Sequence, residues 1–468
     1  MVSILGANSV SGGYEVSNSL RFNDGDSPRL TRTPSSAGNR RTFTLSVWLK
    51  LTVSPSGDSN FERQILAADD GTGGNNNFDY ISINNSDKIF IYNYEGGEAY
   101  VFTSTQLLRD PSAWYHLVVA FDTTQGTNTN RVKIYLNGSQ ITAFDTASYP
   151  SQNHQTRFNN NNAHRIGSYP DHDSQYFDGY MCEYHLVDGS QLAPTSFGEL
   201  DDNGVWVPIK YTGSHGTNGF YLEFKQTGTS QNSSGIGADT SGNDNHWAVT
   251  NFTASENPVT EDTCTNNFAT FNPLIRGAYT LSEGNCKITG GSSETIDNSG
   301  VATISMDSGK FYCEMKPTDV GGNPLFGIIE IDGWNQGSNS LAFNGYFYKK
   351  TGQKIPYAGS GGSNADYGSA ISANDIVSLL YDADNGTLSF YLNGSSQGDA
   401  FTSIDTSKTW TFITWDNTTT GRSIIEANFG NPAFAVSSGN TDGKYGNFEY
   451  APPSGYYALC TKRLAEFG

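Results

Sequence analysis

The stretch Tyr135-Leu136-Asn137-Gly138-Ser139 occurs twice, and its second copy is Tyr391-Leu392-Asn393-Gly394-Ser395. Asn-Gly is the strongest short signal for a two-residue hairpin, because a type I′ turn needs a positive φ angle at both central residues. Each copy ends an alternating strand pattern and follows a longer apolar run that stops at an aspartate, Asp122 or Asp382. The copies lie too far apart for the 20–50-residue repeats of a solenoid. The sequence therefore predicts one strand–turn–strand–hairpin unit in each of two related domains.

The composition of the 468 residues is that of a β protein. Charged residues make up 16% of the chain, below the usual ~25%, and Gly, Asn, Ser and Thr take their place. These are residues of tight turns and strands, and no long amphipathic helix is recognisable. At about 150 residues per domain, the length suits two β-sandwiches with connecting structure.

The chain is strongly acidic, with a formal net charge of −20 and a sequence pI near 4.6. Such a surface repels phosphate backbones, so we expect no nucleic-acid partner and no docking on anionic lipid. No apolar run approaches the ~18 residues of a membrane span, so we expect no membrane insertion. The first residues carry no basic segment followed by an apolar run, so we expect no signal peptide and synthesis in a reducing cytoplasm.

The cysteines are odd in number and far apart, and none forms a Cys-x-x-Cys pair: Cys182, Cys264, Cys286, Cys313 and Cys460. This spacing indicates neither a zinc site nor a disulfide framework. We expect buried free thiols in a protein made under reducing conditions.

Regular alternation begins near Ser19 and is clearest at Thr42–Leu49. Further strands are predicted at 62–68, 79–84, 88–93, 98–103, 114–122 and 131–137. The turns between them are rich in Gly, Asn and Asp, and the spacing is typical of a sandwich. His116 lies inside one apolar strand, so we expect it to be a hydrogen-bonded core residue.

Five motifs follow in order along the first half of the chain. They are Phe-x-Leu-x-x-Trp-Leu (43–49), Trp-Tyr-His-Leu-Val-Val-Ala-Phe-Asp (114–122), Ile-Tyr-Leu-Asn-Gly (134–138), Ile-Gly (166–167) and Phe-Asp-Gly-x-x-x-Glu (177–183). Over about residues 19–195 this series resembles the laminin-G-like, concanavalin-A-type jelly rolls. The resemblance implies a β-sandwich, which we assign to residues 19–199.

The second half carries another series: Ser308–Met315, Leu325–Ile329, Gly345–Tyr348, Leu388–Gly394 and Asn428–Phe434. This series is similar to SPRY (B30.2-type) domains, which are also concanavalin-like sandwiches, and we assign it to residues 265–435. The two families share a topology that places a hairpin at Tyr-Leu-Asn-Gly. The repeat is therefore a feature of the framework rather than a site.

We predict an all-β protein with two concanavalin-like jelly-roll β-sandwiches in tandem. Residues 1–18 are interpreted as an N-terminal arm or docking segment, and residues 436–468 as a C-terminal tail. Residues 200–264 are a connecting region that either completes the first sandwich or folds as a small subdomain.

The whole arrangement resembles virion proteins of tailed phages, especially marine ones, over nearly the full length. The matching pieces are a short arm, Ser19–Leu30, Arg32–Arg40, the two sandwiches in this order and the tail motif at 453–461. The resemblance implies a virion protein, a tail-fibre or fibre-tip module whose arm docks on other virion proteins. Its sandwich loops would bind a host-surface glycan or receptor, and because fibres are commonly trimers, a homo-oligomer is expected.

Two alternatives remain at this point. One is a capsid decoration, head-fibre or adaptor protein with a purely structural role. The other is a polysaccharide depolymerase, because some glucanases of this fold use Glu-x-Asp-x-x-Glu along a strand. Here Glu330 and Asp332 begin such a pattern, but Asn335 or Gln336 stands where the second glutamate belongs. We therefore predict no catalytic residues and no enzyme activity.

Candidate ligand-binding residues lie in two apparent loops of the second sandwich: Trp334, Asn335, Trp415 and Asp416. An exposed indole beside an amide or a carboxylate suits a sugar ring, which stacks on the aromatic face and forms hydrogen bonds at its edge. No cofactor is expected. The laminin-G resemblance leaves a structural calcium ion open, with Asp69, Asp70 and Asp122 at strand ends as ligands, although such carboxylates more often cap turns.

Overall fold

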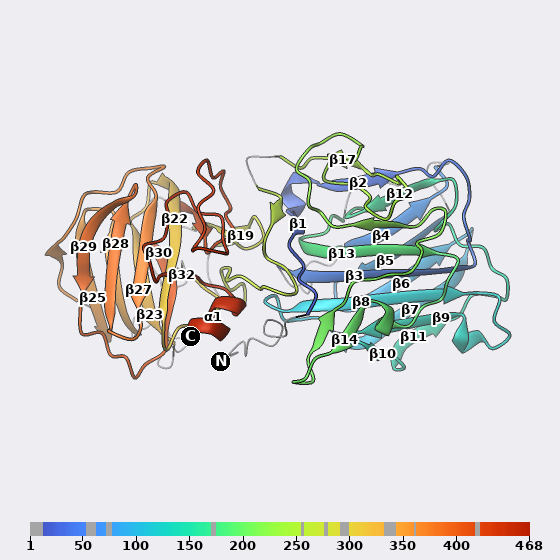
Figure 1. Ribbon diagram of the computed structural model, residues 1–468, viewed down its shortest axis with the longest axis horizontal. Coiled ribbons are helices and arrows are strands. Elements are labelled where there is room, and N and C mark those ends of the chain that lie inside the picture. Colours follow the sequence, from blue (N-terminus) through green and yellow to red (C-terminus); the bar gives the residue numbers. More distant parts are fainter. Residues whose placement is uncertain are drawn as a thin grey trace. The chain divides into compact units, whose positions relative to one another are not determined.

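The computed structural model describes residues 13–52, 62–71, 77–169, 175–253, 257–275, 279–290, 299–331, 343–359, 362–416 and 422–468. The chain divides into two compact units. The first unit is Ser11–Ala254 with Pro258–Thr265, and the second is built mainly from Asn266–Gly468. Figure 1 follows both units from blue to red along the sequence.

The first unit is a sandwich of two eight-stranded sheets. One, called here the β3 sheet, has the order β10-β9-β8-β3-β13-β1-β18, with β16 paired to β13. Its strands are β1 (Ser19–Phe22), β3 (Thr42–Leu51), β8 (Trp114–Asp122), β9 (Val132–Leu136), β10 (Ser139–Gln140), β13 (Gly179–Asp188), β16 (Phe220–Leu222) and β18 (Val259–Thr260).

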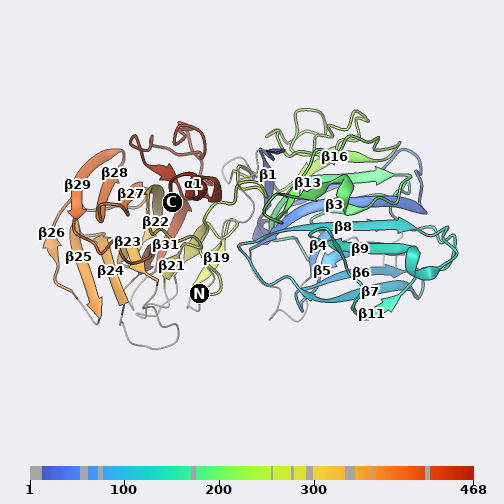
Figure 2. The ribbon, with the colours of Figure 1, turned by 60° about the horizontal axis from the view of Figure 1, so that its bottom comes forward.

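The other sheet, called the β5 sheet, has the order β11-β7-β6-β5-β4-β12-β2-β17. Its strands are β2 (Arg29–Arg32), β4 (Arg63–Asp69), β5 (Phe78–Ile83), β6 (Lys88–Tyr94), β7 (Glu98–Leu107), β11 (Phe144–Ser148), β12 (Ala163–Ile166) and β17 (Ala248–Thr250). A small hairpin, β14 (Gly198–Leu200) with β15 (Trp206–Pro208), and the short helices η1 (Asp24–Asp26), η2 (Asn128–Asn130) and η3 (Pro194–Ser196) complete the unit. Figure 2 shows the two layers, with β3, β8 and β13 in one and β4 to β7 in the other.

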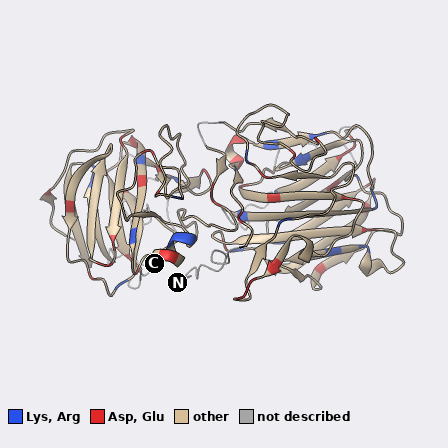
Figure 3. Ribbon diagram, viewed as in Figure 1, with Lys and Arg blue, Asp and Glu red and all other residues tan. Residues whose placement is uncertain are grey.

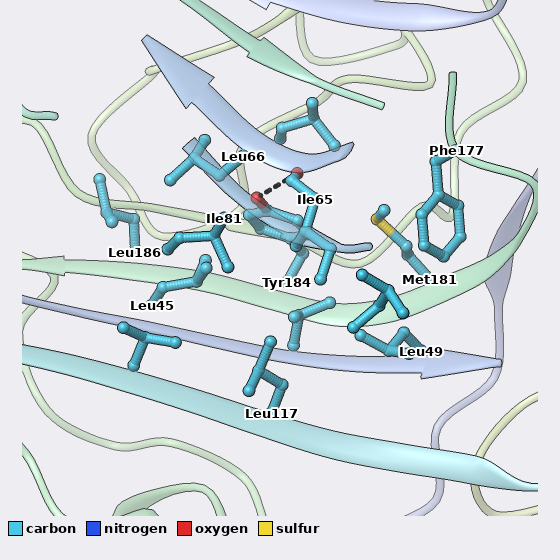
Figure 4. Close-up of a cluster of buried hydrophobic side chains, with 14 of the residues drawn as sticks. Leu45, Leu49, Ile65, Leu66, Ile81, Leu117, Phe177, Met181, Tyr184 and Leu186 are labelled. Carbon is cyan, nitrogen blue, oxygen red and sulfur yellow. Dashed lines mark hydrogen bonds between the residues drawn. The ribbon is translucent and has the colours of Figure 1, made fainter. Parts of the chain in front are cut away.

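Strict alternation produces this sandwich, because every second side chain of a strand points into the space between the sheets. The alternating residues Phe43, Leu45, Val47 and Leu49 of β3 are fully buried in the core, as their pattern predicts. Figure 4 shows this core, in which the Tyr184 hydroxyl donates a hydrogen bond of 3.0 Å to the Ile65 carbonyl oxygen of the facing sheet. The predicted strands agree with β4 to β9 to within four residues at each end.

Residues 200–265 extend both layers of the first sandwich. β16 pairs with β13 and β18 with β1 in the β3 sheet, whereas β17 pairs with β2 in the β5 sheet. Lys50 and Asp262 form a buried ion pair of 2.8 Å, which fixes this segment to β3. Of the two arrangements that the sequence left open for the connecting region, the structure shows the one in which it completes the sandwich.

The second unit is also a sandwich. The β22 sheet has the order β19-β20-β31-β22-β27-β28-β29 with β32 paired to β22, and the β23 sheet has the order β21-β30-β23-β24-β25-β26. The strands of the β22 sheet are β19 (Thr280–Ser282), β20 (Lys287–Thr289), β22 (Lys310–Val320), β27 (Val377–Asp382), β28 (Thr387–Leu392), β29 (Ser395–Phe401), β31 (Ser423–Asn428) and β32 (Tyr457–Ala458). Those of the β23 sheet are β21 (Ser299–Val301), β23 (Pro324–Glu330), β24 (Phe343–Lys349), β25 (Gln353–Gly359), β26 (Ala365–Asp366) and β30 (Trp410–Asp416).

The C-terminal residues pack on this second sandwich. β32 runs parallel to β22, and the chain ends in the helix α1 (Thr461–Phe467). A small cluster covers the face of the β22 sheet that points away from the main core. In it, Tyr312 and Leu380 of the sheet pack against Phe448, Ala458 and Cys460. The buried Glu314 carboxylate holds the same segment by accepting the backbone N–H groups of residues 449 and 450 at 3.0 and 2.7 Å.

Both predicted hairpins are present. Asn137 and Gly138 have φ angles of 48° and 80°, and Asn393 and Gly394 have angles of 49° and 75°, as a type I′ turn requires. Leu136 pairs with Ser139 in the first unit, and Leu392 pairs with Ser395 in the second. The prediction of one hairpin in each domain is confirmed.

All five cysteines are buried free thiols, and the Sγ atoms of Cys182 and Cys264 lie 3.7 Å apart. In the part of the chain that the structure describes, no helix has the length and apolarity needed to cross a bilayer. Figure 3 shows Asp and Glu scattered over strands that carry few charged residues.

Candidate ligand-binding face

Five aromatic rings form a stripe on the outer face of the β5 sheet. They lie at alternate positions of two neighbouring strands, Phe78 and Tyr80 on β5 and Phe90, Tyr92 and Tyr94 on β6. The residues between them, such as Ile81, Ile89 and Ile91, point inward and belong to the core. The five rings therefore point away from the core, and four of them are only half-buried.

The rings contact one another in a continuous series. Phe78 is stacked against Tyr94 with centroids 5.7 Å apart, and Phe90 against Tyr92 with centroids 5.8 Å apart. Tyr80 links the two pairs, because its ring centroid lies 5.9 Å from that of Phe78 and 5.7 Å from that of Tyr92. Along the strands the stripe covers about 13 Å, because each residue of a strand advances by about 3.3 Å. This length leaves room for more than one sugar ring.

Polar side chains lie on both sides of the stripe. The strand register places three rows of outward-facing residues across β4, β5, β6 and β7. The rows are Gln64–Ser82–Phe90–Thr103, Ala67–Tyr80–Tyr92–Val101 and Asp69–Phe78–Tyr94–Glu98. Aromatic rings thus occupy the middle of the face. The polar groups of Gln64, Ser82 and Asp69 on one side are buried, whereas Thr103 and Glu98 on β7 are accessible.

The other outer sheet faces are covered by packed side chains. On the β3 sheet, Trp48, Trp114 and Tyr180 are buried with Val16 and Cys264. On the second sandwich, the C-terminal segment covers the β22 sheet, and a second small core lies on the β23 sheet. On the aromatic stripe, the one ring contact from outside β5 and β6 among the described residues comes from Tyr169, which packs on Phe78 and Tyr80.

The two ends of strand β4 differ in charge. At one end, the Asp69 carboxylate pairs with the Arg165 guanidinium and also accepts the backbone N–H of Gly71. Just before the other end, the Glu62 carboxylate accepts hydrogen bonds from Gln64 at 3.3 Å and from Ser82 at 3.2 Å. Burial raises the pKa of Glu62, although its hydrogen bonds oppose this shift.

Two family models match the sequence, one in each unit. A laminin-G model, described as the Concanavalin A-like lectin/glucanases superfamily, matches residues 24–195, and a SPRY domain model matches residues 295–425. The chain contains a laminin-G-like domain followed by a SPRY domain.

Some solved structures match parts of this chain at low sequence identity. The SPRY domain of human HERC1 is 18% identical, with a TM-score of 0.28 over 34% of this chain and 96% of that chain. The SAP-like pentraxin from Limulus polyphemus is 13% identical, with a TM-score of 0.29 over 39% of this chain and 80% of that chain. A search of curated proteins gave no match.

The aromatic residue predicted at 415 lies in a strand of the SPRY domain, not in a loop. Trp415 belongs to β30, which pairs with β21 on one side and β23 on the other. Its side chain is 2% exposed and packs against Phe343, Phe347 and Tyr357. The indole face is therefore covered by protein.

The neighbouring Asp416 ends the same strand of the SPRY domain and is also buried. Its Oδ1 atom accepts the backbone N–H of Asn323 at 2.9 Å, so it fixes the turn before β23. The other two candidates, Trp334 and Asn335, lie outside the described residues, and their role stays a prediction.

Glu330, the first acid of the glucanase-like pattern, is at the end of β23 in the SPRY domain. It accepts a hydrogen bond of 2.6 Å from Asn344 and pairs with Lys408 at 3.0 Å. The bond from Asn344 lowers the pKa of Glu330, whereas a general acid needs a raised one. Asp332 lies outside the described residues.

The carboxylates considered for calcium have other partners in the laminin-G-like domain. Asp69 pairs with Arg165, and the Asp70 carboxylate accepts a hydrogen bond of 2.6 Å from Asn77. Asp122 caps its turn by accepting the backbone N–H of Thr124 at 3.1 Å. Among the residues that the structure describes, no group of three or more His, Cys, Asp or Glu side chains could hold a metal ion.

The sequence analysis missed the aromatic stripe, although a signal for it was present. Phe78-x-Tyr80 and Phe90-x-Tyr92-x-Tyr94 place rings at every second position, with apolar residues between them. Two neighbouring strands that are apolar on both faces point either to a covered sheet or to a binding face. The sequence does not tell which segments cover which face.

Proposed function

We propose that this protein is a non-catalytic recognition module that binds a saccharide on the aromatic stripe of its laminin-G-like domain. We further propose that it does so as a fibre component of a tailed-phage virion. The observation that carries the first proposal is the continuous series of aromatic rings, four of them half-buried, on an outer sheet face with polar residues beside it.

The chemistry of this face suits a sugar. A pyranose ring has apolar C–H faces that pack on aromatic rings, and its edge carries hydroxyl groups that need hydrogen-bond partners. The description of the matching laminin-G model as a lectin superfamily is consistent with this proposal.

The virion part of the proposal is supported by the sequence resemblance alone. It rests on the arm, the order of the two sandwiches and the tail motif. In this proposal the arm contacts other virion proteins, the protein assembles as a homo-oligomer, and avidity from many copies offsets weak individual contacts. Labelling of intact particles with an antibody against this chain tests it, and a signal on the capsid instead of the fibres would contradict it.

The binding part is tested with the full chain on a glycan array and on purified host-envelope polysaccharide. The wild type is expected to bind, and Tyr92→Ala is expected to weaken binding by roughly tenfold, because the loss of one stacking ring costs about 1.4 kcal/mol. Tyr391→Ala removes a half-buried tyrosine of the SPRY domain and serves as the matched control. Equal binding by the wild type and Tyr92→Ala would contradict the proposed site.

A further inference from the structure

The Glu62 carboxylate lies beside one end of the aromatic stripe. Glu62 comes directly before β4, and its Oε2 atom accepts hydrogen bonds from Gln64 Nε2 and Ser82 Oγ. Ser82 stands opposite Phe90 in the register of β5 and β6. The Tyr80 hydroxyl lies close enough to influence the Glu62 pKa. Glu62 therefore borders the end of the stripe formed by Tyr80 and Phe90.

This carboxylate has no basic partner among the ion pairs of the described residues. Asp69, at the far end of the same strand, is neutralised by Arg165. The end of the stripe at Tyr80 and Phe90 therefore borders a carboxylate with no ion-pair partner among the described residues, and the exposed Glu98 lies opposite Tyr94 at the other end. The chain's net charge of −20 adds no compensating positive field.

We propose that Glu62 is a specificity-determining residue, which makes the aromatic stripe selective for neutral, hydroxyl-rich saccharides over anionic ones. This inference rests on the proposed saccharide-binding function.

The argument follows from the chemistry of the two groups. An ionised carboxylate is a pure acceptor with about four lone-pair sites, and two of those at Glu62 are used by Gln64 and Ser82. The hydroxyls of a neutral sugar donate hydrogen bonds to the remaining sites. A uronate, sialate or phosphate group has no proton to give and repels the carboxylate, and partial burial strengthens that repulsion.

The test compares the wild type, Glu62→Gln and Asp202→Asn in the full chain. Asp202→Asn removes one exposed negative charge of the same domain, far along the sequence from β4, and controls for net charge. A glycan array with matched neutral and anionic oligosaccharides, such as oligogalactan and oligogalacturonate, finds the ligands. Calorimetric titration of the matched pairs then measures the discrimination.

The wild type and Asp202→Asn are expected to bind the neutral member at least about tenfold more tightly than the anionic one. Glu62→Gln is expected to reduce this ratio to about threefold or less, because the isosteric amide carries no charge. Should the glutamine variant fail to fold, the wild type still tests the inference. Its discrimination must shrink as salt rises from 50 to 500 mM, since salt screens a repulsion between charges.

The remaining outcomes contradict either the Glu62 inference alone or the proposed function as well. Equal binding of both members by the wild type, or an unchanged ratio in a folded Glu62→Gln, would overturn the Glu62 inference and leave the proposed function standing. Hits confined to anionic sugars or to cationic amino sugars would overturn it as well. Failure of the wild type to bind any glycan would overturn the proposed function, and the inference with it.

Discussion

The side-chain oxygen of Asn137 accepts the backbone N–H of His116 at 2.8 Å, and the Asn137 backbone N–H donates to the His116 carbonyl oxygen at 2.9 Å. The second domain repeats this pair of bonds between Asn393 and Ile376, at 2.8 and 2.9 Å. The repeated asparagine is thus a clamp that joins the hairpin to the start of the neighbouring strand. Because this asparagine makes the same two hydrogen bonds in both domains, the same residue type stands in both hairpins.

The glycine of each hairpin lies under an aromatic ring. A Cβ atom at Gly138 would lie 2.5 Å from the Trp206 ring, and one at Gly394 would lie 2.6 Å from the Tyr450 ring. Trp206 comes from the hairpin β14–β15, and Tyr450 comes from the C-terminal segment. The close approach of these rings adds a second reason for glycine, beyond the positive φ angle.

Removal of the clamp is expected to destabilise one unit at a time. Asn137→Ala leaves the His116 N–H without its acceptor and places alanine at a φ angle of 48°, which together cost roughly 2–3 kcal/mol. Asn393→Ala has the same expected cost in the second unit. Calorimetry of the full chain should show one unfolding transition shifted by each variant. Asn137→Asp keeps an acceptor and is expected to cost clearly less, and an equal cost would contradict the clamp.

Local patterns explain why the strands could be predicted. Alternation at Thr42–Leu51 and the Asn-Gly signal both depend on residues close in sequence, so both gave the right elements. The sequence pattern Trp-Asp-Asn is typical of the start of a loop, so it predicts a loop at Trp415. In the structure the preceding residues pair on both sides, with β21 and β23, and these partners are distant in sequence. Its burial is therefore a tertiary property.

The candidate site depends on tertiary structure even more strongly. The rings of Phe78 and Tyr92 remain half-buried on an outer sheet face, whereas Trp48 and Trp114 on the opposite sheet are covered by Val16 and Cys264. Alternation fixes which side chains share a face. It does not fix which face remains open.

Trp415→Ala is expected to destabilise the SPRY domain by about 3–5 kcal/mol, because it leaves a cavity among Phe343, Phe347 and Tyr357. Thermal unfolding of the full chain measures this cost. Trp415→Phe fills most of the space and should cost less. Saccharide binding at a temperature where the variant remains folded is expected to be unchanged, and a specific loss of binding would restore Trp415 as a ligand contact.

The second unit is expected to lose stability as the pH rises towards 8. Burial raises the pKa of Glu314 to about 7, although donors such as the Tyr450 backbone N–H oppose the shift. The folded state therefore holds a proton that the unfolded state, with a pKa near 4.5, releases. This contribution is fully present below about pH 4.5 and is lost as the pH rises through about 7.

Comparison with Glu314→Gln isolates this effect. The glutamine side chain does not titrate. It still lies against the backbone N–H groups of residues 449 and 450, so the substitution lowers the free energy of unfolding by the same amount at every pH. The difference in unfolding free energy between wild type and variant should narrow by roughly 2–3 kcal/mol between pH 5 and pH 8. Glu449→Gln, whose side chain binds Ser437, is the control for a neighbouring carboxylate. A pH-independent difference would contradict the shifted pKa.

His116 is expected to produce the opposite pH dependence in the first unit. Its ring is fully buried, with Nδ1 accepting from the Trp206 indole N–H at 2.9 Å and Nε2 lying 2.8 Å from the Ser46 hydroxyl. Burial lowers its pKa to about 3. His116 therefore stays neutral in the folded state at a pH below 6.5, where it binds a proton in the unfolded state. The stabilising contribution is thus present above pH 6.5 and is lost as the pH falls through about 3.

His116→Gln tests this expectation, because an amide can still accept from Trp206 and donate to Ser46 but does not titrate. Between pH 6 and pH 4, the wild type should lose stability relative to the variant by roughly 1.4 kcal/mol per pH unit. Differences between wild type and variant cancel the other titrating groups of the unit, such as Asp178, whose pKa burial raises to about 6. A constant difference over this range would mean that His116 is protonated in the folded protein, and the hydrogen bond from the Trp206 indole to its Nδ1 atom would then be impossible.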